Sequence, residues 1–167
     1  MKFRMLVPLL ALLFMASSGK PPLSVRFHST ANPVEGEPFV MKIMVPNPPR
    51  EVTIHKVPEI SEQDIIAIYP FSAPDGTMGC SFKLDAHGGI GLGTLSVDRR
   101  GSILVALVNG RVVTAMMIDR PVTDGIITIS SGLTAQEIVM LQQKFRTLGQ
   151  KVPMKRKLFN AIKWGAE

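Results

Sequence analysis

The strongest constraint on the fold is a pair of apolar runs joined by Asn109-Gly110. Residues 102–108 are almost entirely apolar, and residues 111–119 form a second run rich in Val, Thr, Met and Ile. Asn-Gly between two such runs favours a two-residue type I′ turn, because both central residues need positive φ angles. The continuous apolarity of residues 102–108 predicts a central strand that is covered on both faces. The chain is therefore expected to contain a hairpin within an antiparallel sheet.

Further strands are predicted on both sides of this hairpin. Residues 78–84 alternate in polarity, with one face formed by Met, Cys, Phe and Leu, as expected for a strand with a buried face. The cluster Pro46-Asn47-Pro48-Pro49 must interrupt any strand, because proline has no N–H for a ladder. The other strand-like runs are 39–45, 51–56, 65–69 and 126–129, of which the first two are placed to pair across the proline cluster.

The clearest helix signal begins at Thr134. Glu137 stands at the third helical position, so that the two side chains can form a capping box. Leu133 and Ile138 are placed for a hydrophobic staple across the same cap. Gly149 is a typical helix stop, and we expect the helix to run toward it.

The connection between strand 78–84 and the hairpin is rich in glycine, with Gly88, Gly89, Gly91 and Gly93 in one short run. Each glycine inside a helix costs about 1 kcal/mol relative to alanine. We therefore expect a flexible or bulged connection here instead of a helix. The run also lacks the G-x-G-x-x-G spacing and the Lys-Ser/Thr ending of phosphate-binding loops, which excludes a nucleotide site of those types.

Strand, connection, hairpin, strand and capped helix together predict an α+β fold. We expect a mainly antiparallel sheet with one or two helices packed on one face, in a ferredoxin-like arrangement.

The N-terminus has the pattern of a secretory signal peptide. Lys2 and Arg4 precede an apolar run, residues 5–15, and small residues follow at 16–18. A helix of eleven residues is about 16 Å long, roughly half of a hydrocarbon core, so a permanent span is not expected. We expect an exported protein, periplasmic or extracellular, cleaved near Ser18; the alternative is a buried N-terminal helix or strand.

Five motifs follow one another between Met78 and Phe145. They are Phe82-Lys83-Leu84-Asp85, Leu104 to Val108, Asn109 to Val113, Asp124-Gly125, and Ile127 to Glu137. Their order resembles the head subdomain of the first periplasmic domain of the protein-export subunit SecD. The resemblance implies the fold and a role near exported polypeptides. SecD also has transmembrane helices that couple export to proton flow, and its first connection is normally a helix, so the resemblance does not imply a motor.

Composition and this resemblance divide the chain into four parts. These are a signal peptide (1–18), a proline-rich lead with N-terminal strands (19–60), a SecD-head-like domain (61–149) and a basic amphipathic tail (150–167). From residue 19 to 143 there are ten Lys and Arg against twelve Asp and Glu, whereas from 144 onward there are seven against one. The basic charge of the chain therefore belongs to its C-terminal end.

The tail predicts a short basic amphipathic helix, because Met154, Leu158 and Ile162 recur every four residues. Such a helix could contact a protein partner or lie on an anionic membrane. The alternative is a frayed tail, or one docked on its own domain. Nucleic acid is not an expected partner, since a single Trp and a single Tyr offer no stacking platform. The candidate contact residues are Lys151, Lys155, Arg156, Lys157, Lys163 and Trp164.

No group of residues in the sequence predicts a catalytic, cofactor or metal site. Cys80, Asp85, His87 and His55 come nearest to a zinc set but lack the paired spacing of zinc ligands. Cys80, the single cysteine, is expected to be a small buried residue within a strand. His28 lies in the proline-rich lead, which we expect to be flexible.

The leading hypothesis is therefore an exported, non-enzymatic, protein-binding module associated with protein export or the cell envelope, with no identified small-molecule substrate. Two alternatives stay open. One is an exported enzyme of an unrecognised type, which a deep pocket with convergent Asp85, His87 and Cys80 would favour. The other is a purely structural domain of the envelope.

Overall fold

The computed structural model describes residues 23–46 and 48–149. The predicted signal peptide and the candidate tail contacts Lys151, Lys155, Arg156, Lys157, Lys163 and Trp164 lie outside them. Among the described residues, no helix is long and apolar enough to cross a membrane. The elements are β1 (Val25–Ser29), η1 (Pro33–Glu35), β2 (Val40–Pro46), β3 (Pro49–His55), β4 (Ile65–Ser72), β5 (Met78–Leu84), α1 (Ala86–Asp98), β6 (Ile103–Val108), β7 (Arg111–Met117), β8 (Ile126–Leu133), α2 (Ala135–Lys144) and β9 (Arg146–Thr147).

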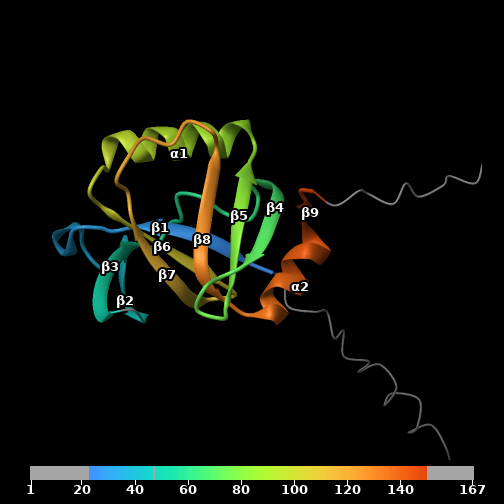
Figure 1. Ribbon diagram of the computed structural model, residues 1–167. Coiled ribbons are helices and arrows are strands. Elements are labelled where there is room, and N and C mark those ends of the chain that lie inside the picture. Colours follow the sequence, from blue (N-terminus) through green and yellow to red (C-terminus); the bar gives the residue numbers. More distant parts are fainter. Residues whose placement is uncertain (1–22, 47, 150–167) are drawn as a thin grey trace, which may run out of the picture.

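The strands form three sheets, with the orders β1-β6-β7, β2-β3 and β8-β5-β4-β9 (Figure 1). The pairs are antiparallel except for β4 with β9, which is parallel. The predicted pairing of β2 with β3 across the proline cluster is confirmed. Mostly antiparallel strands with two helices confirm the predicted α+β class.

The main core fills the space between the three-stranded and the four-stranded sheet. Phe27 of β1 and Phe82 of β5 meet there, and Leu92 of α1 and Leu141 of α2 belong to the same buried cluster. Both helices thus contribute to this core, and α1 lies across the ends of the strands (Figure 1). Residues 23–27 and residues 60–141 contribute to one core.

The central strand β6 is covered on both faces, as its continuous apolarity predicts. Leu104, Ala106 and Val108 face the main core. Val105 faces a smaller cluster formed with the β2–β3 hairpin, which lies over the other side of the three-stranded sheet. At the end of β6, Asn109 and Gly110 have φ angles of 50° and 77°, which confirms the tight turn.

The glycine-rich connection is a helix, so the expectation of a flexible or bulged segment was wrong. Asp85 caps α1 by accepting a hydrogen bond from the Gly88 N–H at 2.8 Å. A Cβ on Gly88 would lie 2.7 Å from the Cβ of Asp64, so glycine lets the first turn approach the preceding loop. Leu92 and Leu95 are buried in the core, and this packing offsets the low helix propensity of glycine.

The proline-rich lead is ordered where it carries His28, so the expectation that this segment is flexible was wrong. Residues 25–29 form β1, which pairs antiparallel with β6. His28 is only 2% exposed, and its Nδ1 lies 2.8 Å from the His55 carbonyl oxygen. Burial lowers the pKa of His28, which disfavours the protonated form of this ring.

The capping box of α2 forms as predicted, between Thr134 and Glu137. The helix nevertheless ends at Lys144, well before Gly149, which corrects the predicted stop. Phe145 adopts an extended backbone, and residues 146–147 leave the helix to pair with β4 as β9.

Candidate functional site: a groove between two strand edges

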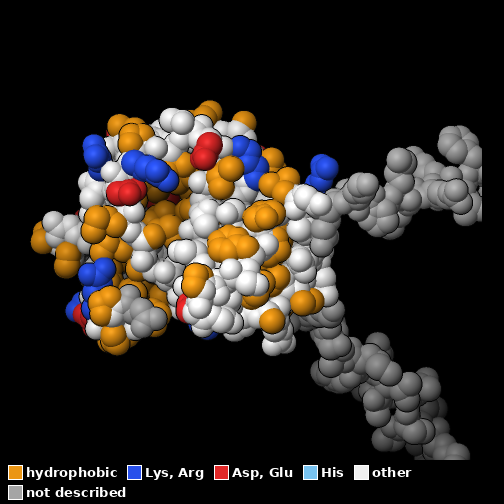
Figure 2. Space-filling view, in the orientation of Figure 1, with side chains coloured by type: hydrophobic (Ala, Val, Ile, Leu, Met, Phe, Trp, Pro, Cys, Tyr) orange, Lys and Arg blue, Asp and Glu red, His pale blue; other side chains and the backbone are white. Residues whose placement is uncertain are grey.

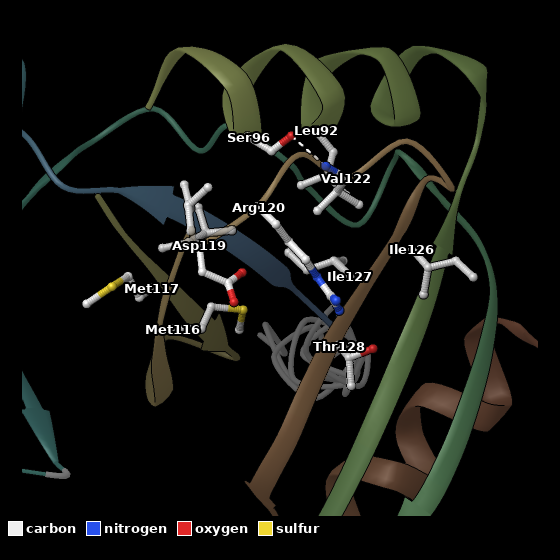
Figure 3. Close-up of a pocket in the computed structure, with 12 residues that line it drawn as sticks. Leu92, Ser96, Met116, Met117, Asp119, Arg120, Val122, Ile126, Ile127 and Thr128 are labelled. Atoms are coloured by element: carbon white, nitrogen blue, oxygen red, sulfur yellow. Dashed lines mark hydrogen bonds between the residues drawn. The ribbon is translucent and has the colours of Figure 1, made fainter. Parts of the chain in front are cut away.

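A recess of about 260 Å³ lies beneath α1. Figure 2 shows apolar side chains in a hollow under this helix, with charged side chains at its rim. Met116 and Met117 of β7 lie on one side and Ile126 to Thr128 of β8 on the other (Figure 3). Leu92 of α1 and Leu104 of β6 complete the apolar lining.

Both walls of this groove are the outermost strands of their sheets. Ile118, which follows β7, accepts a hydrogen bond from the Gly101 N–H and donates one to the Ser102 carbonyl. Along a strand, the backbone N–H and C=O groups of successive residues point to opposite sides. Met117 therefore turns its own backbone N–H and C=O away from β6, toward the groove. On β8, Gly125 accepts from the Leu84 N–H, so that Ile126 likewise turns its backbone groups away from β5. By the same alternation, the backbone N–H and C=O groups of Ala115 and Thr128 also point toward the groove.

The groove is a wedge that closes toward the Asn109-Gly110 corner. A Cβ on Gly132, at the end of β8, would lie 3.1 Å from the Val113 carbonyl oxygen of β7. At the other end of the same strands, Met117 and Ile126 line the open cavity. The two walls thus run antiparallel, in contact near Val113 and apart near Met117.

The open end of the wedge is roofed by α1. Ser96 accepts a hydrogen bond from the Val122 N–H at 2.8 Å and donates to the Gly93 carbonyl at 2.8 Å. This bridge holds the connection between β7 and β8 against the helix. Asp119 and Arg120 are exposed at the rim, and Arg120 extends over the cavity toward Thr128 (Figure 3).

The chemistry of the groove suits binding. Its lining is mostly aliphatic and thioether, with the hydroxyl residues Ser96 and Thr128, and the two charged side chains that line it, Asp119 and Arg120, are exposed. Methionine side chains adapt their shape to different apolar partners. Unpaired strand edges offer main-chain donors and acceptors to an added strand.

Cys80, Asp85, His87 and His55, the residues that come nearest to a zinc set in the sequence, do not all converge. Asp85 and His87 lie with Asp64, their ligand atoms within 4.8 Å of one another. Cys80 is fully buried in β5, and burial raises its pKa to about 12. His55 instead bonds to Glu35, with its Nε2 3.0 Å from a carboxylate oxygen.

A second polar network has the residue types of a catalytic triad. The Ser29 hydroxyl lies 2.9 Å from His55 Nδ1 and donates to Glu59 at 2.6 Å. Ser29 is completely buried, however, and its proton is held by the carboxylate. A nucleophile must reach a substrate, so this network ties β1 to the end of β3 and carries no acyl-transfer site.

The comparisons with known proteins point to one fold. No protein-family model and no curated protein matches the sequence. Two solved structures are similar, one described as a membrane component SecDF that enhances protein export and the other as SecDF in a super-membrane-facing form. This chain has a SecD-like fold. With the first, the TM-score is 0.50 at 18% identity over 74% of this chain and 63% of the other; with the second, it is 0.50 at 17% over 74% and 19%. The chain thus spans less than two thirds of either SecDF chain.

Sequence reasoning identified the strands that flank the groove but not the groove itself. The sequence placed four apolar lining residues in strands but did not indicate which strands lie beside them. These residues are Met116, Met117, Ile126 and Ile127. The sequence did contain a signal for the end of the strand that forms one wall. In Ile118-Asp119-Arg120-Pro121, charge and proline prevent the strand from continuing.

Proposed function

We propose that this protein binds an extended segment of polypeptide in the groove between β7 and β8. The observation that carries the proposal is that β7 and β8 each present an edge with no neighbouring strand among residues 23–46 and 48–149, on opposite sides of an apolar floor. An extended chain placed there gains main-chain hydrogen bonds from Met117 and Ile126 and buries alternate side chains against Leu104.

The topology makes an added strand a natural ligand. A strand between β7 and β8 would join the orders β1-β6-β7 and β8-β5-β4-β9 into one continuous sheet. Because the walls run antiparallel, the ligand would lie parallel to one wall and antiparallel to the other. Main-chain recognition with methionine-lined contacts favours apolar sequences in general, without one required motif.

The similarity to SecDF supports the biological setting that we propose. In this setting the protein is exported, it has no enzymatic activity, and its ligand is an exported polypeptide in an unfolded state. The first of these SecDF structures is described as a component that enhances protein export, and we propose a related task for this chain.

We further propose that the basic tail attaches the module to an anionic surface, either a membrane or a protein partner. Lys151, Lys155, Lys157 and Lys163 with Arg156 would supply the charge and Trp164 the interfacial anchor. Removing residues 151–167 should leave the fold intact and abolish flotation with vesicles that contain anionic lipid. Flotation that persists without the tail would remove this role.

Peptide binding tests the groove directly. A fluorescent peptide with alternating leucine and threonine should bind the wild-type protein. Met116→Arg should weaken binding at least tenfold, because the Met116 side chain points into the recess (Figure 3) and the substitution places a charge there. Met44→Arg is the control, since it introduces the same charge on β2, outside the groove, at a position that is 61% exposed. Equal binding by both variants would contradict the proposed site.

A further inference from the structure

We propose that Arg111 is a latch that sets the width of the β7–β8 groove and thereby the size of the side chains that it accepts. This inference rests on the proposed function and adds a residue that determines its specificity. Arg111 does not line the cavity, so it would act as a positioning residue at the closed end of the wedge.

One guanidinium group joins three elements at that end. Arg111 is the first residue of β7, and its Nη2 donates to the Gly132 carbonyl of β8 at 3.0 Å. The same Nη2 donates to Glu137 of α2 at 2.7 Å, and Nε donates to the second carboxylate oxygen at 3.1 Å. The arrangement is the paired, planar contact that arginine makes with carboxylates.

The carboxylate that receives the latch is fixed in position. The Glu137 side chain is only 9% exposed, and Oε2 also accepts from the Thr134 N–H at 2.8 Å and from the Thr134 hydroxyl at 3.0 Å. A side chain held by its own capping box cannot follow Arg111 if β7 moves. The latch therefore anchors a strand to a rigid helix terminus.

The two walls of the groove are otherwise weakly joined. Within the described residues, β7 and β8 share no hydrogen-bonded ladder, since each is the last strand of its sheet. Val113 and Gly132 touch next to the latch, and Ser96 secures the far end through the Val122 N–H. The separation of the walls at Met117 is set by these end contacts, so releasing Arg111 should let β7 move away from β8.

A wider groove should change the preference for ligand size. In a hydrophobic site, a difference of one methylene group is worth about 10- to 200-fold in selectivity. With Arg111 in place, the narrower groove should favour ligands with small side chains. Without it, the wider groove should gain more affinity for ligands with large side chains. A variant that merely destabilised the fold would weaken every ligand by a similar factor.

The test measures two peptides on the full chain, one alternating leucine with threonine and one alternating alanine with threonine. We expect R111Q to shift the ratio of their Kd values about tenfold toward the leucine peptide. R111K, which keeps the charge but loses the planar pair of donors, should fall between R111Q and the wild type. The matched control is K42Q, which removes the same charge from the exposed pair that Lys42 forms with Glu51 at 2.9 Å, and should keep the wild-type ratio.

A second measurement follows the groove width without any peptide. Spin labels on M117C and I126C, both exposed positions, report the distance between the walls, while the native Cys80 is fully buried. R111Q should lengthen this distance relative to K42Q, and E137Q provides the same test if R111Q fails to fold. An unchanged ratio and an unchanged distance would overturn the latch while leaving peptide binding intact. If the wild type bound neither peptide, the proposed function would fail and the latch with it.

Discussion

Phe27 and Phe82 meet edge to face, with ring centroids 5.8 Å apart and an interplanar angle of 74°. The first ring belongs to β1 and the second to β5, so this contact joins the three-stranded sheet to the four-stranded sheet. Both side chains are fully buried. The N-terminal strand is thus part of the core that supports the groove.

Phe27→Ala should destabilise the protein by about 3–5 kcal/mol, because a large buried ring is lost and leaves a cavity. Phe39→Ala is the matched control, since Phe39 is 67% exposed, and its change in unfolding free energy should stay within about 0.5 kcal/mol. Urea denaturation measures both. Similar values for the two variants would show that β1 is not needed for the core.

Gly88→Ala should destabilise the protein by about 1–3 kcal/mol, because the new Cβ would meet the Cβ of Asp64 at 2.7 Å. Gly91→Ala, in the same helix with open space around it, should instead stabilise by about 0.5–1 kcal/mol. The unfolding free energies of the two variants check this opposition of sign. A stabilising effect of both would mean that the first turn of α1 does not approach Asp64.

The latch should make stability depend on pH. Burial alone would raise the pKa of Glu137, but Arg111 and the Thr134 donors outweigh it, and the pKa lies below its usual value. This contribution is fully present above the unfolded-state pKa, near 4.3, and is lost as the pH falls through the lower folded-state pKa. Between about pH 5 and pH 3, E137Q should lose less stability than the wild type. Parallel curves for the two proteins would contradict this linkage.

Cys80 should be almost unreactive in the native protein. Its thiol is fully buried, and the pKa of about 12 leaves little thiolate at pH 8. Alkylation by iodoacetamide at this pH should be slow in buffer and rapid in denaturant. Rapid labelling of the native protein would place Cys80 at an accessible surface.

The sequence correctly predicted those elements that are determined by a few neighbouring residues. The Asn109-Gly110 turn and the Thr134 cap each depend on a few consecutive residues, and both formed as expected. The helix α1 could not be predicted from propensity, because its stability comes from burying Leu92 and Leu95 and from the close approach of Gly88 to Asp64. Tertiary packing outweighed the local preference.

The groove could not be derived from the sequence, since it depends on which strands end up at sheet edges. Residues 111–119 and 126–129 were predicted as ordinary strands, and their sequences do not indicate whether each strand has one neighbour in the sheet or two. The contacts of Arg111 with Gly132 and Glu137 join residues 21 and 26 positions apart, which no spacing rule connects.

The most direct test of peptide binding in the groove is amide hydrogen exchange of the wild-type protein, with and without the alternating leucine peptide at saturation. Added main-chain hydrogen bonds should slow exchange at the groove-facing amides of Ala115, Met117, Ile126 and Thr128, and leave the amides of β2 unchanged. Unchanged exchange at these four positions, or protection confined to β2, would contradict the account.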